Sequence, residues 1–244
     1  SKTALEWMKS SSNSKNVLVQ VGEGYKGLRR LLLAELEKPQ SFLLLSGLTG
    51  SGKTRLINQI AASLPTIDLE GLARHPGSSF GYCFSQTQPT QATFENALAL
   101  KLMQMDRKFP AFPIVLEDES RLIGKRSLPN TIFQSMNLSP IVLIEEPLEK
   151  RVQIIFEDYV LEPINQGFCR FELEKNLVDA TKRIRERLGG NLCNEIVHGI
   201  KVAFEADPPQ NLILHEKWIT PLLETYYDPL YQRSRNKRQG RIIF

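Results

Sequence analysis

SFLLLSGLTGSGKTRLINQIAA, residues 41–62, is the stretch that decides the fold. Its apolar run at 42–45 is typical of a buried strand, and apolar residues at helical spacing follow from Leu56 onward. Between the two, residues 47–54 match the pattern G-x-x-x-x-G-K-[ST]. Glycines in such a loop let successive backbone N–H groups point at one anion, and the helix N-terminus behind them adds partial positive charge. The sequence therefore predicts a phosphate-binding site between this strand and this helix.

Two side chains of this loop have predicted roles of their own. Lys53 is expected to reach the terminal phosphates of a ligand, and the hydroxyl of Thr54 is expected to take a position on Mg²⁺. The predicted phosphate-binding residues are Gly47, Leu48, Thr49, Gly50, Ser51, Gly52, Lys53 and Thr54.

The composition is that of a soluble globular protein. The 244 residues are enough for one large domain or two small ones, and 41% of them are hydrophobic and 24% charged. A net charge of +4 does not by itself indicate nucleic-acid binding. The three cysteines stand far apart, which argues against a disulfide scaffold or a zinc site and fits a reducing cytosol. Without a bilayer-length apolar stretch or a secretory signal, we expect a cytoplasmic protein with no membrane partner.

Strands and helices alternate through the first part of the chain. After the strand at 42–45, further apolar strands are predicted at 65–70, 113–117 and 139–145, with helical patterns between them. Such alternation implies a parallel sheet with right-handed crossovers. From Pro147 onward the pattern becomes helical, with breaks expected at Pro163, at the Gly189-Gly190 pair and at the prolines of 208–209. We predict an α/β fold, with a P-loop NTPase-like parallel sheet flanked by helices and then a mainly helical C-terminal portion.

An acidic stretch, PIVLEDESR at 113–121, resembles a Walker B strand. A short apolar strand of this kind ends in a carboxylate that faces the metal opposite the loop threonine. Asp118 or Glu119 is expected to hold Mg²⁺ through water or to act as a base, and Arg121 to pair with these acids or to contact phosphate. Because side chains alternate along a strand, the neighbouring acids are not expected to point the same way.

The loop GLARHPGSSFG at 71–81 follows the second predicted strand. A flexible surface connection would explain its composition. However, the carboxyl ends of the strands are where open α/β sheets bind ligands, and this loop is expected to lie there. We therefore predict that Arg74, His75, Ser78 and Ser79 contact a substrate.

Positive charge concentrates in the helical portion. KRIRER at 182–187 places four cations within a short helical stretch, and the tail at 233–241 carries five more. A solvated helix face and a frayed terminus would explain either stretch alone, whereas two of them in one lobe favour contact with a phosphate backbone. Tyr226, Tyr227 and Tyr231 precede the tail and suit either core packing or stacking on bases.

Several stretches, spread in order over nearly the whole chain, together resemble one family, the tRNA 2-selenouridine synthases. They are GYKGLRR (24–30), GLTGSGKT (47–54), DLEGLARHPGSSFG (68–81), QPTQ with FEN (88–96), EDESRLIG (117–124), EEPLEKRV (145–152) and YYDPLY (226–231).

The resemblance implies a transferase that modifies tRNA. Such enzymes replace the sulfur of 2-thiouridine at the wobble position with selenium from selenophosphate, through an S-geranyl intermediate made from geranyl diphosphate. They join a rhodanese-like domain with an essential cysteine to a P-loop domain. By this resemblance we expect residues 1–25 to be the tail of a rhodanese-like domain, 26–150 the P-loop α/β domain and 151–244 a helical, basic portion. The loop chemistry alone does not distinguish geranyl diphosphate from ATP or GTP.

Two other functions fit the same residues. One is an ATP- or GTP-dependent kinase or NTPase, in which Lys53 serves hydrolysis or phosphoryl transfer. The other is a non-catalytic tRNA-binding module that needs a separate rhodanese-like chain as its partner. In the transferase, we expect Lys53, Asp118, Glu119 and Arg121 to be catalytic, and Thr54 and Asp118 to hold a metal. The residues expected to bind tRNA are Arg29, Arg30, Lys182, Arg183, Arg233, Arg235, Lys237 and Arg238.

Overall fold

The computed structural model describes residues 23–75, 77, 80, 87–206, 211–236 and 239–243, with only the backbone of 234–236 and 239. Ser78, Ser79, Lys237 and Arg238, which were predicted to contact substrate or tRNA, lie outside the described residues, as does the side chain of Arg235. Nearly all of the segment expected to end a rhodanese-like domain lies outside them too.

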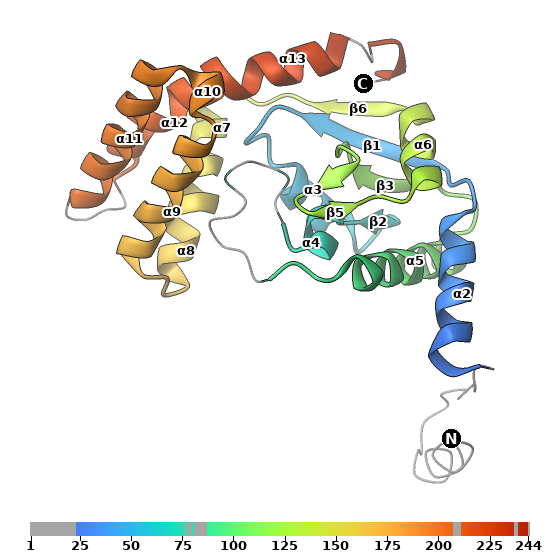
Figure 1. Ribbon diagram of the computed structural model, residues 1–244. Helices are drawn as coiled ribbons and strands as arrows, with labels where there is room; N and C mark the ends of the chain where they lie inside the picture. The colour runs from blue at the N-terminus through green and yellow to red at the C-terminus, as the bar shows by residue number, and fades with distance from the viewer. Residues whose placement is uncertain are drawn as a thin grey trace.

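A parallel sheet of four strands forms the centre of the first part of the chain (Figure 1). The strand order is β2-β3-β1-β6, and every pairing is parallel, as the alternation of strands and helices predicts. The strand that precedes the phosphate loop, β1, is thus an inner strand with β3 and β6 as neighbours. The strands are β1 (Phe42–Gly47), β2 (Thr66–Ile67), β3 (Ile114–Glu117) and β6 (Ile141–Ile144).

Helices cover both faces of this sheet because its strands are apolar on both sides. Leu44 belongs to a core formed with α2 (Gly24–Leu36), α5 (Gln91–Lys108) and α6 (Asn130–Leu138). Its neighbour Leu45 points to the opposite face and packs in a smaller core with Ile57 of α3 (Lys53–Ile60). The α/β fold predicted from the sequence is confirmed.

The region after β2 differs from the prediction, which extended this strand to residue 70. The strand ends at Ile67, and a short helix, α4 (Leu69–Ala73), begins directly after it. Asp68 is the reason, because its side chain caps the helix by accepting the backbone N–H of Gly71 at 2.6 Å. A two-stranded antiparallel hairpin, β4 (Leu122–Ile123) and β5 (Arg126–Ser127), is also absent from the prediction. Strands of two residues are too short to produce a periodic pattern.

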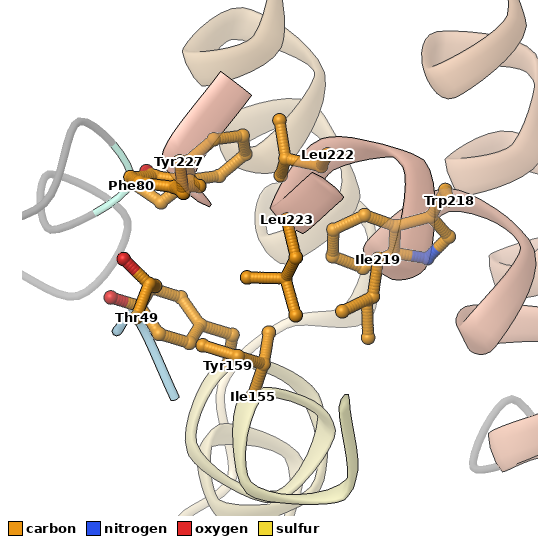
Figure 2. A pocket seen from close by; sticks show the side chains of 9 residues that line it. All are labelled: Thr49, Phe80, Ile155, Tyr159, Trp218, Ile219, Leu222, Leu223 and Tyr227. Atoms are coloured by element: carbon orange, nitrogen blue, oxygen red, sulfur yellow. The ribbon is translucent and has the colours of Figure 1, made fainter. Parts of the chain in front are cut away.

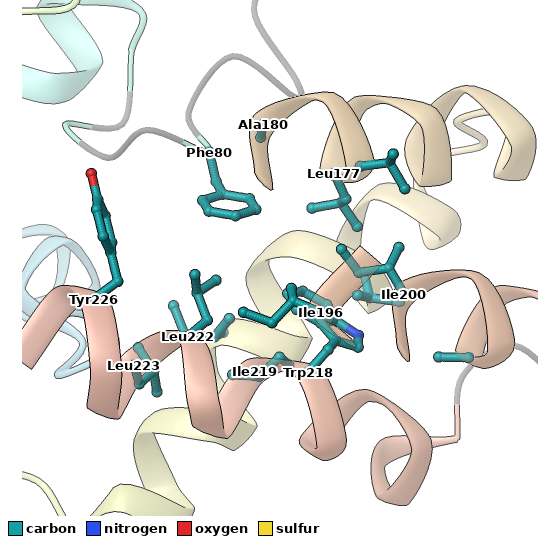
Figure 3. Packing of buried hydrophobic residues seen from close by; sticks show 14 of the residues in the cluster. Phe80, Leu177, Ala180, Ile196, Ile200, Trp218, Ile219, Leu222, Leu223 and Tyr226 are labelled. Atoms are coloured by element: carbon teal, nitrogen blue, oxygen red, sulfur yellow. The ribbon is translucent and has the colours of Figure 1, made fainter. Parts of the chain in front are cut away.

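The second part of the chain is helical, as predicted, and packs around its own core (Figure 3). Trp218, Ile219 and Leu222 lie at its centre, and Phe80 reaches it from the first part of the chain. The helices are α7 (Leu148–Phe156), α8 (Glu162–Asn165), α9 (Arg170–Arg183), α10 (Arg185–Leu188), α11 (Gly190–Glu205), α12 (Leu212–Leu222) and α13 (Asp228–Asn236). Two π-helical turns, η2 (Glu157–Leu161) and η3 (Leu223–Tyr227), and a 3₁₀ turn, η4 (Gln239–Arg241), complete it.

The helix break predicted at Pro163 is wrong. α7, η2 and α8 run on continuously through Glu162 and Pro163, and α8 ends at Asn165. Proline is tolerated there because it stands in the first turn of α8, directly after the wider π-helical turn. Among the described residues, no helix is long and apolar enough to cross a membrane.

The chain returns to the sheet at its C-terminal end. α13 leaves the helical portion and runs along the edge formed by β6 (Figure 1). Beyond it, Ile242 forms an isolated parallel bridge with Ile141 of β6, and the N–H of Ile243 donates to the carbonyl of Ile141 at 2.9 Å. The first turn of α13 is thereby held beside the ends of the central strands.

Candidate active site

The phosphate loop joins β1 to α3 with the geometry that its glycines require. A Cβ at Gly47 would lie 2.6 Å from the carbonyl oxygen of Ile144, and one at Gly50 would lie 2.8 Å from that of Arg151. Gly50 and Gly52 also have positive φ angles, of 82° and 74°. The loop can therefore close tightly at the start of α3 only with glycine at these positions.

The side chain of Lys53 lies folded over the loop. Its Nζ donates to the carbonyl of Gly47 at 2.8 Å and to that of Leu48 at 3.3 Å. Burial lowers the pKa of Lys53, and the nearby carboxylates of Glu70 and Glu119 oppose this shift. A phosphate bound in the loop would replace these two carbonyls as the partner of the ammonium group.

A large open cleft, here called the phosphate cleft, extends from the loop and has a volume of about 730 Å³. Residues 49–54 form one wall, and the carboxylates of Glu70 and Glu119 lie beside them. The helical portion lines the rest of the cleft with Asp158, Arg187 and a larger set of apolar and aromatic side chains. The apolar and aromatic ones are Ile154, Ile155, Tyr159, Tyr226, Tyr227, Leu230 and Tyr231.

Glu70, which the sequence analysis did not select, is the acid that faces Thr54. The hydroxyl of Thr54 donates to Oε2 of Glu70 at 3.2 Å, and the backbone N–H of Gly77 donates to Oε1 at 2.5 Å. Glu119 is hydrogen-bonded to Glu70 and completes an acidic pair. One signal was available, because Glu70 follows the second strand and the carboxyl ends of parallel strands meet at one edge.

The three consecutive acids at the end of β3 point in three directions. Glu117 is buried and accepts the backbone N–H of Leu69 at 3.0 Å. Asp118 accepts the hydroxyl of Ser46 at 2.7 Å, whereas Glu119 faces the phosphate cleft. The sequence left Asp118 and Glu119 as alternatives for the Mg²⁺ ligand or the base. Glu119 lines the same cleft as Thr54 and Lys53, whereas Asp118 lines a different cavity.

Burial raises the pKa of two of these carboxyl groups. It raises the pKa of Glu117 to about 8, together with the negative charge of Asp68. It raises the pKa of Glu119 to about 7, together with the charge of Glu70, while Lys53 acts in the opposite direction. Glu119 thus gains and loses a proton near neutral pH, which suits a general base.

A small apolar pocket of about 20 Å³, with room for about one water molecule, adjoins the phosphate cleft at Thr49 (Figure 2). It extends between the two π-helical turns, which supply Tyr159, Leu223 and Tyr227. Isolated π-helical turns often occur at functional sites. Phe80, Ile155, Trp218, Ile219 and Leu222 complete the lining.

A buried ion pair ties the phosphate loop to the helical portion. The side chain of Arg151 is 3% exposed, and its Nε donates to the carbonyl of Thr49 at 2.9 Å. Its Nη1 and Nη2 donate to the two carboxylate oxygens of Asp228 at 3.0 Å and 2.5 Å. Next to Asp228, α13 brings the ring of Tyr231 to 5.6 Å from Nζ of Lys53. No sequence pattern indicated this pairing, because 77 residues separate its partners.

The other predicted site residues are dispersed. Arg121 lines a separate cavity beside Asp118, and His75 is buried against Gly124 of the β4–β5 turn. In the described part of the chain, neither Arg74 nor His75 lines the phosphate cleft, so their contact with substrate stays a prediction.

The predicted tRNA-binding cations lie in different surroundings. Arg29 is paired with Glu95 and bonded to Asn96, and the exposed Arg30 is paired with Glu23. Lys182, Arg183 and Arg233 are exposed on α9 and α13. Arg187, from the same basic stretch, lines the phosphate cleft and donates to the hydroxyl of Tyr226 at 3.4 Å. Tyr226 and Tyr227 are buried in the helical core.

Comparison with known proteins assigns the chain to one family. The family profile described as the tRNA 2-selenouridine synthase AAA domain matches residues 40–244. The chain is 38% identical over 233 residues to the tRNA 2-selenouridine synthase of Hahella chejuensis, covering 91% of this chain and 60% of that protein. It is 37% identical over 257 residues to that of Shewanella frigidimarina, covering 100% and 68%, and 40% identical over 233 residues to that of Alcanivorax borkumensis, covering 91% and 63%.

The chain spans between 60% and 68% of the length of these three relatives. No solved structure matches it. The extent of the profile match and the identity to relatives over most of the chain leave one assignment: the chain belongs to the tRNA 2-selenouridine synthase family.

Proposed function

We propose that this chain is the diphosphate- and tRNA-binding part of a transferase that moves a geranyl group from geranyl diphosphate to the sulfur of wobble 2-thiouridine. Replacement of the alkylated sulfur by selenium from selenophosphate follows in the complete enzyme. The observation that carries the proposal is the meeting of the phosphate loop with the aliphatic and aromatic side chains that line the phosphate cleft. A ligand with a charged head and an apolar tail suits this junction.

The two parts of the ligand would occupy different parts of the cleft. The amides of residues 47–54 and the ammonium of Lys53 would bind the diphosphate and stabilise its charge as it leaves. The chain would lie within the phosphate cleft along Ile155 and Tyr159. The helical portion adds further aliphatic and aromatic side chains to this part of the cleft, among them Ile154, Tyr227 and Leu230. These side chains would give a prenyl chain apolar contact along its length, and on this ground we favour the prenyl compound over ATP or GTP.

The residues beside the loop fit Mg²⁺. This ion prefers oxygen ligands and is commonly held by one or two carboxylates together with substrate phosphates. Thr54 and Glu70 are within hydrogen-bonding distance of each other, and Glu119 is bonded to Glu70. Thr54 and Glu70 would hold the ion, with Glu70 taking the part that the sequence assigned to Asp118. When bound, Mg²⁺ would help to neutralise the departing diphosphate.

Positive side chains of the helical portion would position the tRNA without reading its sequence. Lys182 and Arg183 are exposed near the end of α9, and Arg187 carries the same charge to the rim of the phosphate cleft. Together with Arg233 on α13, they would contact the phosphate backbone. We further propose that residues 26–150 and 151–244 act as the two parts of this site, and that a rhodanese-like domain or chain completes selenium transfer.

The proposal is tested by incubating the chain with geranyl diphosphate, Mg²⁺ and an anticodon stem-loop containing 2-thiouridine. The nucleoside product is identified by mass spectrometry, and geranyl diphosphate binding is measured by calorimetry. Lys53→Ala should weaken that binding by about 10- to 100-fold, because a charge-assisted hydrogen bond is lost, and should abolish the S-geranyl product. Lys150→Ala removes an exposed lysine of α7 and should change neither.

Nucleotide hydrolysis is followed in parallel. Hydrolysis of ATP or GTP that requires Lys53, without geranyl transfer, would contradict the proposal and support the kinase or NTPase. RNA binding without either activity would instead support the binding module that needs a rhodanese-like partner.

A further inference from the structure

A second cavity lies on the far side of Glu119 from the phosphate loop. It has a volume of about 410 Å³, within the range of about 300–1,000 Å³ that is usual for small-molecule sites. We call it the lateral cavity. It shares five wall residues with the phosphate cleft: Gly77, Glu119, Ser120, Leu230 and Tyr231. The two cavities are therefore adjacent and share part of their lining.

The lateral cavity combines an apolar base with a polar rim. Leu44, Phe133 and Met136 lie at its apolar base, where Phe133 is partly exposed and the other two are almost completely buried. Asp118, Arg121 and Asn137 supply polar groups around it. A flat heteroaromatic ring fits such a lining, because its faces pack against apolar side chains while its edge forms hydrogen bonds.

Two of the polar side chains at the rim are available to form hydrogen bonds with a ligand. Arg121 and Asn137 are exposed, and neither side chain forms a hydrogen bond or ion pair with another residue in the described ranges. Asn137 offers both a donor and an acceptor, and Arg121 offers donors only. A pyrimidine edge presents both kinds of partner.

We propose that the lateral cavity binds the acceptor base, a thiocarbonyl pyrimidine turned out of the RNA chain. The inference rests on the proposed function. It adds a location for the second substrate that the family assignment does not give. Bases in single-stranded RNA loops are accessible to this kind of binding, because they leave the stack at little cost.

The proposed step conserves atoms and charge. The sulfur lone pair forms a bond to C1 of the allylic chain, and the C1–O bond breaks with its electron pair leaving on the diphosphate. The N3 proton of the base passes to the carboxylate of Glu119, so the S-alkylated base is neutral. Glu119 is placed for this because it faces both cavities.

The test fills the lateral cavity without touching the phosphate cleft. Asn137→Trp places an indole in it from an exposed position of α6, and Gln134→Trp is the matched control, because Gln134 is exposed on the same helix but lines neither cavity. We expect Asn137→Trp to lower kcat/KM for the stem-loop at least tenfold while Kd for geranyl diphosphate stays within twofold. Gln134→Trp should match the wild type. Unchanged kcat/KM in Asn137→Trp would overturn the proposal.

A second measurement does not depend on geranyl transfer. The thiocarbonyl base is photoreactive, so the stem-loop is irradiated on the wild-type chain and the cross-linked peptide is mapped by mass spectrometry. Cross-links within 118–121 or 133–137 would support the lateral cavity even if no S-geranyl product formed, in which case only the proposed function would fail. Cross-links confined to other segments would overturn the cavity assignment while leaving the proposed function standing.

Discussion

At the end of β3, three neighbouring residues with the same carboxyl group have different surroundings. They are Glu117, Asp118 and Glu119. Glu117 turns inward to the N–H of Leu69, Asp118 reaches across to Ser46, and Glu119 lies between two cavities. Only Glu119 combines burial, access to both cavities and a pKa near neutrality. At this scale, the base of the proposed reaction is selected by orientation, since all three residues carry the same chemical group.

The proposed role of Glu119 predicts a pH dependence. Its carboxylate is active when deprotonated, so the single-turnover rate of geranyl transfer should rise with pH through about 7, the raised pKa of this group. The ionisable groups around it are Glu70 of α4, Lys53 of α3, the adjacent Asp118 and Tyr231 of α13. Glu119→Gln should lower the rate by about 10²- to 10⁴-fold and remove this rise.

The measurement is a series of quenched-flow reactions at saturating substrates, from pH 5.5 to 8.5. Glu119→Asp serves as the conservative control and should keep a reduced rate that still increases with pH. A Glu119→Gln variant with the wild-type slope would assign the titration to another group, with Glu70 as the first candidate.

Among the elements, α7 and α13 matter most to the site because they are joined through Arg151 and Asp228. The guanidinium bonds both carboxylate oxygens of Asp228 and the carbonyl of Thr49, so the two helices and the phosphate loop share one buried group. The π-helical turn η3 leads directly into Asp228, and Tyr231 follows one turn later over Lys53. The wall of the phosphate cleft is thereby attached to the loop that it faces.

Breaking this pair should be costly. Asp228→Ala leaves the guanidinium of Arg151 buried without its carboxylate, and we expect the free energy of unfolding to fall by about 3–5 kcal/mol. Replacing both partners, with Arg151→Met and Asp228→Leu, should recover a large part of that loss, because no buried charge remains.

Urea unfolding followed by circular dichroism measures these changes. Arg55→Met is the control, because Arg55 is 44% exposed in its pairs with Glu157 and Asp158, and such exposed pairs contribute about 0–1 kcal/mol. An Asp228→Ala variant as stable as Arg55→Met would show that the pair does not hold α13 in place.

On the scale of the whole molecule, the site lies where two cores meet. The sheet and its helices supply the phosphate loop and the acids, and the helical portion supplies the aromatic wall and the cations. Neither core alone encloses the phosphate cleft. We expect the two to act as one unit in which the RNA approaches from the helical side.

This arrangement predicts a salt-dependent RNA affinity that depends on α9. Removing two phosphate contacts with Lys182→Ala and Arg183→Ala should reduce the slope of log K against log salt by roughly 1.4–1.8. Lys101→Ala, which removes an exposed lysine of α5, should leave the slope unchanged. Fluorescence anisotropy with a labelled stem-loop between 50 and 300 mM salt measures it. A slope unaltered in the double variant would place the RNA on another surface.

The sequence by itself determined the features that depend on neighbours in the chain. The strand, the phosphate loop and the start of α3 form one local unit, and the alternation of apolar strands with helices predicted the parallel sheet. The sequence also placed an acidic cluster at the end of β3, because strand ends can be recognised from hydrophobic runs.

Only the tertiary structure decided which distant residues meet. It paired Thr54 with Glu70 and joined Arg151 to Asp228 across 77 residues. It also placed Glu119 between two cavities lined from both parts of the chain. Local patterns report propensity and the direction of burial. The choice of partner depends on how the helices pack across the sheet edge, and that packing is settled by the shapes of many side chains together.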